Sequence, residues 1–298
     1  MNMKWNHVRG NTWCIEGRVC IPVYLLNEGE AVLLDSGYAE DRPQLDALLR
    51  EKGLRVRAIL GSHSHNDHSG NHGYYQSLGA EIILPQTEAA LVSDAALLTS
   101  AYWPATAREI AREFSHLLIR SDRSFPQEAA GVEIAGRAFG LLPLPGHTPG
   151  HTGIITPDDV LYVGDALLSP EVLHRAKLPS TADWEMDLAS KRRLETVSHS
   201  GYLLAHSGIY RDLRPLIDEN IADKHRRAQQ ILKWLRERPC WTQTEAVDLI
   251  WQRLGLRNRS FFGQVVFRRN AICALEYLVV VGCLRSWMEE GNRIYQVL

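Results

Sequence analysis

The residues best suited to chemistry lie in the segment Ser62-His63-Ser64-His65-Asn66-Asp67-His68, which places three histidines and one aspartate in six consecutive positions. Imidazole and carboxylate groups are the ligands that borderline and hard divalent metals prefer, and four within so short a span are rare by chance. In extended backbone, side chains two residues apart point to the same side, so His63 and His65 can converge on one ion. Asp67 and His68 point elsewhere, which allows them to serve a second ion.

Further ligand-type residues follow short apolar segments that are typical of buried strands. Residues 56–60 precede the histidine loop, 137–144 precede the motif P-G-H-T-P-G-H, and 160–163 and 202–205 precede an Asp and a His. Loops at strand ends are where a rigid scaffold usually presents functional groups. The complete set of candidate metal ligands is His63, His65, Asp67, His68, His147, Asp165 and His206. Five histidines and two aspartates suit a pair of adjacent divalent ions bridged by one carboxylate.

Such a pair of ions predicts hydrolytic chemistry without a serine or cysteine nucleophile. Two metals ~3.5–4 Å apart clamp the attacking and leaving oxygens and lower the pKa of a shared water toward ~7. We therefore expect a metal-bridging hydroxide to attack an ester, thioester, lactone or phosphodiester centre, with Asp67 as the catalytic carboxylate that orients it or shuttles its proton. Zn is the expected metal, and Fe or Mn fit the same ligands.

The composition is that of an ordinary globular protein. The 298 residues are 45% hydrophobic and 23% charged, enough for one large core and a smaller domain. Residues 219–298 carry 13 Lys+Arg against 8 Asp+Glu, whereas residues 1–218 carry 20 against 27. A basic small domain attached to an acidic large one is a weak indication of an anionic partner.

Cysteine usage and the N-terminal residues indicate the compartment. The cysteines are Cys14, Cys20, Cys240, Cys273 and Cys283, and no C-x-x-C motif occurs, which favours reduced thiols. Residues 1–7 lack the apolar core of a signal peptide, and no apolar run approaches the ~20 residues that span a bilayer. We expect a cytoplasmic protein without a membrane partner.

The segment 86–127 interrupts the strand pattern and is predicted to be a helical insertion. The exposed-looking tetrapeptide Ala101-Tyr102-Trp103-Pro104 lies in its middle. Such an insertion either lids a site, with Tyr102 and Trp103 at the mouth of the pocket, or packs as a plain helical hairpin. The pattern after it predicts helices over about 183–198 and over 209–236.

Four motifs in order, H-S-H-N-D-H, P-G-H-T-P-G-H, V-G-D and A-H-S-G, resemble the successive metal motifs of the metallo-β-lactamase superfamily over roughly residues 10–210. The resemblance implies an α/β fold, an αββα sandwich with the site along one edge between the sheets. It also implies that His63, His65 and His147 hold one ion, that Asp67, His68 and His206 hold the other, and that Asp165 bridges them. Asp35, in the L-D-S-G motif, would orient the ligand loops. The complete ligand set resembles the glyoxalase-II-like hydrolase branch, whereas flavodiiron oxygen reductases have a Glu where His65 stands.

The C-terminal segment changes rhythm after Pro239. Helices are predicted over 244–254 and about 264–280, followed by strands over 283–287 and 293–298. This order resembles a winged helix appended to some β-lactamase-like hydrolases, so we divide the chain into a catalytic domain, 1–218, and a winged-helix-like domain, 219–298.

Two functions from different classes remain open. The first is a small-molecule hydrolase for an ester or thioester, in which the tail serves packing or homodimer formation. The alternative is a metal-dependent ribonuclease or nucleic-acid binder, in which Arg257, Arg259, Arg268 and Arg269 meet phosphates. We favour the small-molecule hydrolase, because residues 272–281 are too apolar for an exposed groove-reading face.

Overall fold

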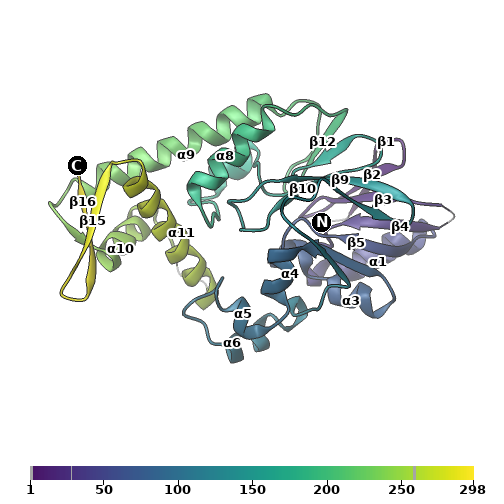
Figure 1. Cartoon of the computed structure of the whole chain (residues 1–298), viewed down its shortest axis with the longest axis horizontal. Helices are drawn as coiled ribbons and strands as arrows, with labels where there is room; N and C mark the ends of the chain where they lie inside the picture. Colours follow the sequence, from purple (N-terminus) through teal and green to yellow (C-terminus); the bar gives the residue numbers. More distant parts are fainter. Residues whose placement is uncertain (1–2, 28, 258–259) are drawn as a thin grey trace.

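The computed structural model describes residues 3–27, 29–257 and 260–298 and contains two large mixed sheets (Figure 1). The strands of the first sheet, in spatial as well as chain order, are β1 (Lys4–Arg9), β2 (Thr12–Glu16), β3 (Ile21–Leu25), β4 (Glu30–Leu34), β5 (Arg55–Leu60), β6 (Glu81–Pro85) and β7 (Arg123–Phe125). Strands β1 to β4 pair antiparallel, whereas β4 to β7 pair parallel. The parallel half brings the carboxyl ends of β4 and β5 to one edge.

The second sheet has the order β13-β12-β11-β10-β9-β8. Its strands are β8 (Gly131–Ile134), β9 (Arg137–Pro143), β10 (Thr152–Ile155), β11 (Val160–Tyr162), β12 (Gly201–Leu204) and β13 (Gly208–Tyr210). Only the pairing of β11 with β12 is parallel, so the loops after these two strands leave at the same edge. The predicted helix over 209–236 was wrong at its start, because residues 208–210 form β13 and the helix begins at Arg214.

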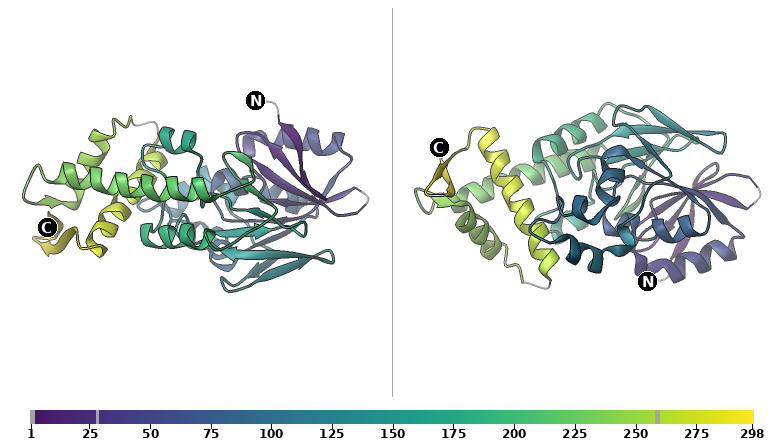
Figure 2. Two further views of the ribbon diagram at one scale, coloured as in Figure 1. Left: turned by 90° about the horizontal axis from the view of Figure 1, so that it is seen from above. Right: turned by 60° about the horizontal axis from the view of Figure 1, so that its bottom comes forward.

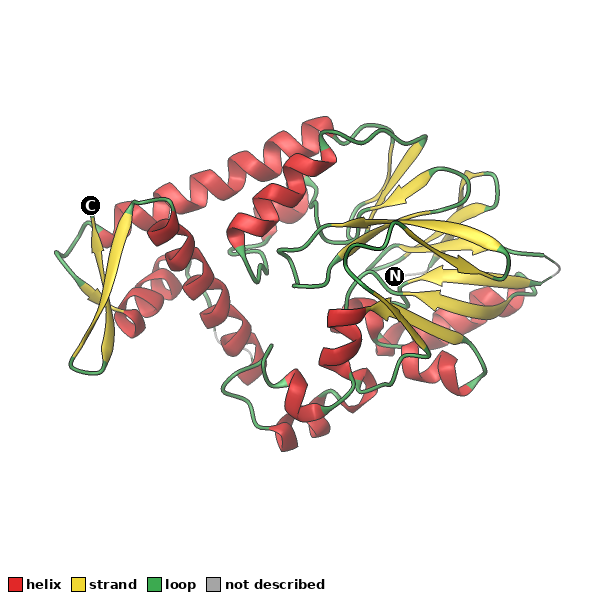
Figure 3. Cartoon of the chain, viewed as in Figure 1, coloured by secondary structure: helices red, strands yellow, loops and turns green. Residues whose placement is uncertain are grey.

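The two sheets pack face to face around one apolar core. Tyr24 and Leu34 of the first sheet belong to the same buried cluster as Phe139, Tyr162 and Leu203 of the second. Helices α1 (Arg42–Glu51) and α3 (His72–Ser77) cover the outer face of the first sheet. Helices α8 (Trp184–Leu194) and α9 (Arg214–Leu235) pack on the second sheet at one end, through Leu194, Leu216 and Ile217, and extend beyond it toward the C-terminal unit (Figure 3). The predicted αββα arrangement is therefore present.

The segment 86–127 contains helices α4 (Gln86–Val92), α5 (Ala95–Leu98) and α6 (Ala107–Glu113), and then strand β7. The insertion is thus not helical throughout, because residues 123–125 pair with β6 at the edge of the first sheet. Its helices form a small apolar cluster that includes Phe262 of α11 (Phe261–Val280). The shorter helices of the chain are η1 (Ala39–Asp41), α2 (Asn66–Ser69), η2 (Ser115–Leu117) and α7 (Pro170–Arg175).

Beyond α9 the chain adds strand β14 (Trp241–Thr242), helix α10 (Gln243–Arg253), helix α11 and the hairpin of β15 (Leu284–Glu289) and β16 (Asn292–Val297). The three strands form a small antiparallel sheet in the order β14-β16-β15. Helix α9 joins both units, since Ile217 packs under the second large sheet while Leu235 lies in the C-terminal core (Figure 2). The predicted division at 218/219 falls inside this helix.

Two further observations concern the cysteines and the helices. The five cysteines form no disulfide in the structure. In the part of the chain that the structure describes, no helix has both the length and the apolar character required to cross a membrane.

Candidate metal centre

The histidine segment leaves strand β5 as a short extended loop and then turns into helix α2. His63 and His65 lie on the extended part, as expected, and His65 is the residue that precedes the helix. Asp67 and His68 lie on α2 itself rather than on a loop, so the expectation of a continuous loop was wrong. The turn of this helix, closed by a bond from the His68 amide to the His65 carbonyl, points the second pair of side chains away from the first.

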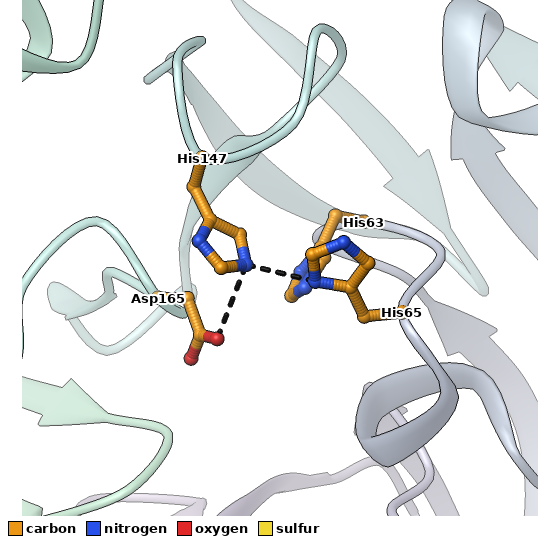
Figure 4. Close-up of side chains that lie close together, drawn as sticks. All are labelled: His63, His65, His147 and Asp165. Atoms are coloured by element: carbon orange, nitrogen blue, oxygen red, sulfur yellow. Dashed lines mark hydrogen bonds and ion pairs between the residues drawn. The ribbon is translucent and has the colours of Figure 1, made fainter. Parts of the chain in front are cut away.

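The seven predicted ligands converge on two groups of side chains. His63, His65, His147 and Asp165 form one group, and Asp67, His68, Asp165 and His206 form the other. In each group one ligand atom per residue lies within 4.8 Å of every other, and Asp165 belongs to both. The first group is drawn in Figure 4.

The two carboxylate oxygens of Asp165 face different groups. Oδ2 lies 3.2 Å from Nε2 of His147, whereas Oδ1 lies 3.4 Å from Nε2 of His68 and 3.3 Å from Nε2 of His206 (Figure 4). Asp67 completes the second group, with Oδ2 3.3 Å from Nε2 of His206. One carboxylate that serves both groups in this way is what a bridging ligand requires.

Hydrogen bonds fix the rings of three histidines so that Nε2 faces the centre. Nδ1 of His147 donates to the carbonyl oxygen of Ser180 at 3.0 Å, and Nδ1 of His68 donates to Asp35 at 2.8 Å. Nδ1 of His63 lies 3.0 Å from the hydroxyl of Ser62, which itself donates to Asp35. With the proton held at Nδ1, the lone pair is at Nε2, where a metal ligand needs it.

Buried polar atoms without partners mark the same place. Among the described residues, Nε2 of His63, Nε2 of His68 and Oδ1 of Asp165 are buried and accept or donate no hydrogen bond. Buried polar groups are normally satisfied, so three unsatisfied atoms that face one another fit a bound cation. The donor set of imidazoles and carboxylates suits Zn, Fe or Mn.

Asp35 supports the ligand loops from behind, as the resemblance implied. Its fully buried carboxylate accepts bonds from the Ser62 amide at 2.7 Å, the Ser62 hydroxyl at 2.7 Å, His68 at 2.8 Å and the Tyr162 hydroxyl at 2.8 Å. Burial raises the pKa of Asp35, but the hydrogen bond and charge of His68 and the bonds from Ser62 lower it to a net value below the usual range. Its backbone has φ 64°, a strained conformation for a non-glycine residue, held by these bonds.

The charges of the two groups differ. In the first, burial and neighbouring imidazoles lower the pKa of His63 well below its usual value and that of His147 to about 3, so both rings stay neutral. In the second, burial lowers the pKa of His206, but Asp165 and Asp67 outweigh it and raise the pKa to about 10. Two carboxylates, Asp67 and Asp165, thus face the imidazoles of the second group, whereas the first group has only Asp165.

The sequence analysis missed Glu88, which lies in the first turn of the insertion helix α4. Its fully buried carboxylate accepts bonds from the Ser64 amide at 3.0 Å and the Ser64 hydroxyl, from the Thr148 hydroxyl at 2.7 Å and from the Gly150 amide at 2.8 Å. Glu88 therefore ties the loop of His63 and His65 to the loop of His147. No sequence signal marks it, because its partners are 24 to 62 positions away.

Two other histidines beside the centre have supporting positions. Nε2 of His151 accepts the Asp165 amide at 3.1 Å, which fixes the backbone of the shared carboxylate. His72 is the first residue of α3, and its Nδ1 lies 2.9 Å from the hydroxyl of Ser36.

Two cavities open on either side of the centre. The first, of about 330 Å³, is bordered by His65, Asp67, His147 and Asp165 and continues between the insertion and α11, along Leu91, Leu98, Tyr102, Val266 and Arg269. The second, of about 190 Å³, is bordered by His147, Asp165 and His206 and continues between α8 and α9. Tyr102 lines the first cavity as predicted, whereas Trp103 is 78% exposed and lines neither.

The arginines proposed to meet phosphates are partly engaged elsewhere. Arg268 pairs with Asp248 at 2.7 Å, and Arg269 donates to the carbonyl oxygen of Ala101 at 3.0 Å, which joins α11 to the insertion. Arg257 is exposed, and Arg259 lies outside the described residues. Arg269 is therefore part of the wall of the first cavity rather than of a free surface.

The fold and the paired ligand groups define a metal-dependent hydrolase. The sequence model of the metallo-beta-lactamase superfamily matches residues 21–206, and the chain belongs to this superfamily. All seven ligand candidates lie inside the matched segment.

Several relatives are hydroxyacylglutathione hydrolases. The GloC form from Haemophilus influenzae is 30% identical over 190 residues, which cover 62% of this chain and 82% of that protein. The enzyme from Pseudomonas entomophila is 28% identical over 134 residues, 44% of this chain and 40% of its own length. The matched part of this chain thus spans less than half of the latter relative.

Two crystal structures share the fold over nearly the whole chain. A metallo-beta-lactamase family protein from Thermus thermophilus has a TM-score of 0.72 at 23% identity and covers 99% of this chain and 98% of its own. A beta-lactamase domain protein from Burkholderia ambifaria has a TM-score of 0.75 at 18% identity, and the match covers 99% of this chain and 94% of that protein. The likeness therefore includes the C-terminal unit.

Proposed function

We propose that the protein is a binuclear metal-dependent hydrolase of thioesters. The observation that carries the proposal is the convergence of seven ligand-type side chains on two groups that share Asp165. The likeness to hydroxyacylglutathione hydrolases supports a thioester rather than another bond as the substrate. Because these relatives act on a small molecule, a small-molecule substrate is the expected partner.

The residues divide between two ions. His63, His65 and His147 would hold one ion, Asp67, His68 and His206 the other, and Asp165 both. Two divalent ions in such a site supply a nucleophile at neutral pH and polarise the carbonyl of the substrate. Zn is the first choice on ligand type, with Fe and Mn as alternatives.

The remaining roles fall to the protein side chains around the centre. Asp67 lies on the rim of the first cavity with its Oδ2 3.3 Å from His206, so its carboxylate can orient the attacking water and hold its proton. Tyr102 stacks on Phe114 with ring centroids 5.0 Å apart and closes the same cavity against water. Burial raises the pKa of Tyr102 to about 12, so its phenol stays protonated at neutral pH.

The test is hydrolysis of a hydroxyacylglutathione thioester by protein stripped with a chelator and reloaded with Zn²⁺. We expect turnover only after reloading, and a loss of about a hundredfold or more in kcat for Asp67→Ala. Asp218→Ala, on the exposed face of α9, is the matched control and should keep the wild-type rate. Metal-independent turnover, or full activity of Asp67→Ala, would contradict the proposal.

We also infer that the C-terminal unit is a winged helix turned toward the catalytic unit. Its elements follow the order helix, strand, helix, helix and hairpin. The second long helix of that unit, α11, forms hydrogen bonds with the catalytic unit. Oδ1 of Asn270 accepts from the Thr181 amide, Cys273 donates to the Ala182 carbonyl oxygen, and Arg269 donates to the Ala101 carbonyl oxygen. The helix that would otherwise read nucleic acid is therefore used to complete the first cavity.

The nucleic-acid alternative is tested in the same preparation. Incubation of the metal-loaded protein with labelled single-stranded RNA should give no cleavage, with the Asp67→Ala variant as the blank. Cleavage of the RNA by the wild type but not by Asp67→Ala would contradict the thioester proposal and favour the ribonuclease alternative. Homodimer formation and cytoplasmic location stay predictions.

A further inference from the structure

The second cavity contains a buried cluster of charge that the metal centre does not use. Lys191 of α8 and Lys224 of α9 both contact the carboxylate of Asp187, Lys191 at 2.7 Å and Lys224 at 2.5 Å. Their exposed fractions are 5%, 8% and 3% for Lys191, Lys224 and Asp187. All three line the cavity that also borders His147, Asp165 and His206.

The charges of this cluster do not balance. Two ammonium groups share one carboxylate, while the other ion pair of the cavity wall, Asp223 with Arg227 at 2.5 Å, is neutral. Burying a charge without a counter-charge is costly, so a single anion in this cavity would complete the cluster. Burial lowers the pKa of Lys224 to about 8, in keeping with an ammonium group short of negative charge.

Hydrogen-bond donors remain for such an anion. Lys224 uses one N–H on Asp187 and one on the hydroxyl of Thr181 at 3.3 Å, which leaves a third. Trp184 also lines this cavity. Its indole N–H is buried and has no hydrogen-bond partner among the described residues. The two groups lie close together, since Nζ of Lys224 is 4.8 Å from the centroid of the Trp184 ring.

We propose that this cavity is a subsite for one carboxylate of the substrate, with Lys224 and Trp184 as donors and Lys191 and Asp187 holding Lys224 in place. The larger cavity on the other side, bordered by Leu91, Leu98 and Tyr102, then takes the apolar part. The substrate class is a thioester with an apolar chain on one side of the scissile bond and a carboxylate on the other. This inference rests on the proposed function.

The experiment uses thioesters that differ only in charge. The first pair is S-butanoyl-3-mercaptopropanoate and its neutral carboxamide, and the second carries the carboxylate or carboxamide at the end of the acyl chain. For the metal-loaded wild type we expect kcat/KM for the charged member of at least one pair to be about tenfold or more higher. Equal kcat/KM values for the charged and the neutral thioester in both pairs would overturn the proposal. This test needs no variant.

Variants then locate the preference. Lys224→Met should remove the charge preference, whereas Lys233→Met, an exposed lysine on the same helix, should keep it. A preference that survives in folded Lys224→Met would overturn the assignment. If Lys224→Met does not fold, Lys224→Gln replaces it in this test. This variant keeps an N–H donor but has no charge, so it should also lose the preference for the charged thioester.

A binding measurement separates this proposal from the proposed function. Butanoate should raise the Tm of the metal-loaded wild type and of Lys233→Met, but not that of Lys224→Met. If no thioester were hydrolysed while this difference held, the hydrolase proposal would fail and the carboxylate site would stand. Equal stabilisation of all three proteins would place butanoate at the metal centre and overturn the site.

Discussion

The metal centre lies within one part of the chain, whereas the walls of its two cavities also use helices beyond that part. Every ligand candidate, and also Asp35 and Glu88, lies inside the superfamily match of residues 21–206. The walls depend on the 86–127 segment, on α8, and on two helices beyond residue 206, α9 and α11. We therefore expect the metal centre to determine the reaction and the cavity walls to determine which substrate is chosen.

This contrast gives a rule for substitutions. Substitutions at the metal centre should lower the rate for every substrate, because they change how the ions are bound. Changes in the walls should alter the ratio between substrates and leave the metal content as it is. Each prediction below tests one side of this rule.

The largest effect is expected at the shared carboxylate. Asp165→Asn removes the charge that faces both ligand groups, so the ions should be held more weakly and kcat should fall by at least about a hundredfold for charged and neutral thioesters alike. Steady-state kinetics with the thioester pairs and elemental analysis of the variant check this. Asp218→Asn is the control, and a change restricted to charged substrates would contradict the rule.

The next effect is expected at Glu88, which accepts bonds from both ligand loops. Glu88→Ala leaves the Ser64 and Gly150 amides without their acceptor, so metal affinity and kcat should fall about 10- to 100-fold. Glu88→Gln, which keeps one carbonyl acceptor, should recover part of the loss. A Co²⁺-loaded sample reports the change in ligand geometry by its visible absorption spectrum. An unchanged spectrum in Glu88→Ala would show that the residue does not position the ligands.

A smaller effect is the pH dependence of charge preference. Lys224 faces Lys191 and Asp187 from α8 and has Asp223 and Arg227 on its own helix. Because burial lowers its pKa to about 8, the free protein loses this positive charge as the pH rises through that value. The ratio of kcat/KM for the charged over the neutral thioester should therefore decrease from pH 7 to pH 9, since titrations common to both substrates cancel. Lys224→Met should give a flat ratio; a flat ratio in the wild type would contradict the assignment.

The smallest effect is expected at Tyr102. Its ring packs beside those of Phe114 and Phe262, with centroid distances of 5.0 and 5.9 Å, and lines the first cavity. Tyr102→Leu should raise KM several-fold for thioesters with long acyl chains and leave acetyl thioesters nearly unchanged, because only long chains reach this wall. Trp103→Leu, at the exposed neighbour, is the control and should change neither value.

The same contrast explains what could be predicted from the sequence. The candidate ligands could be picked out because four ligand-type residues are rare in so short a span and because each group follows an apolar strand, a local pattern. Asp35 was found through its motif. The αββα fold followed from the resemblance. Two of the strands that were missed or misread, β13 and β7, are only three residues long, whereas β1 was missed although it has six residues.

The walls could not be predicted, since their roles depend on contacts between distant segments. Asp187 and Lys191 read as an ordinary exposed i, i+4 pair until α9 places Lys224 over them. Glu88 reads as a polar residue of a short surface helix. The exposure of Trp103 and the partial burial of Tyr102 follow from the packing of the insertion against α11.

The proposed hydrolase requires two ions that act together at one shared carboxylate. The direct measurement is a titration of metal-free protein with Zn²⁺, in which bound metal and thioester hydrolysis are measured in the same samples. We expect two ions per chain, with most of the activity appearing as the second ion binds. Full activity at one ion per chain, with no further binding, would contradict it.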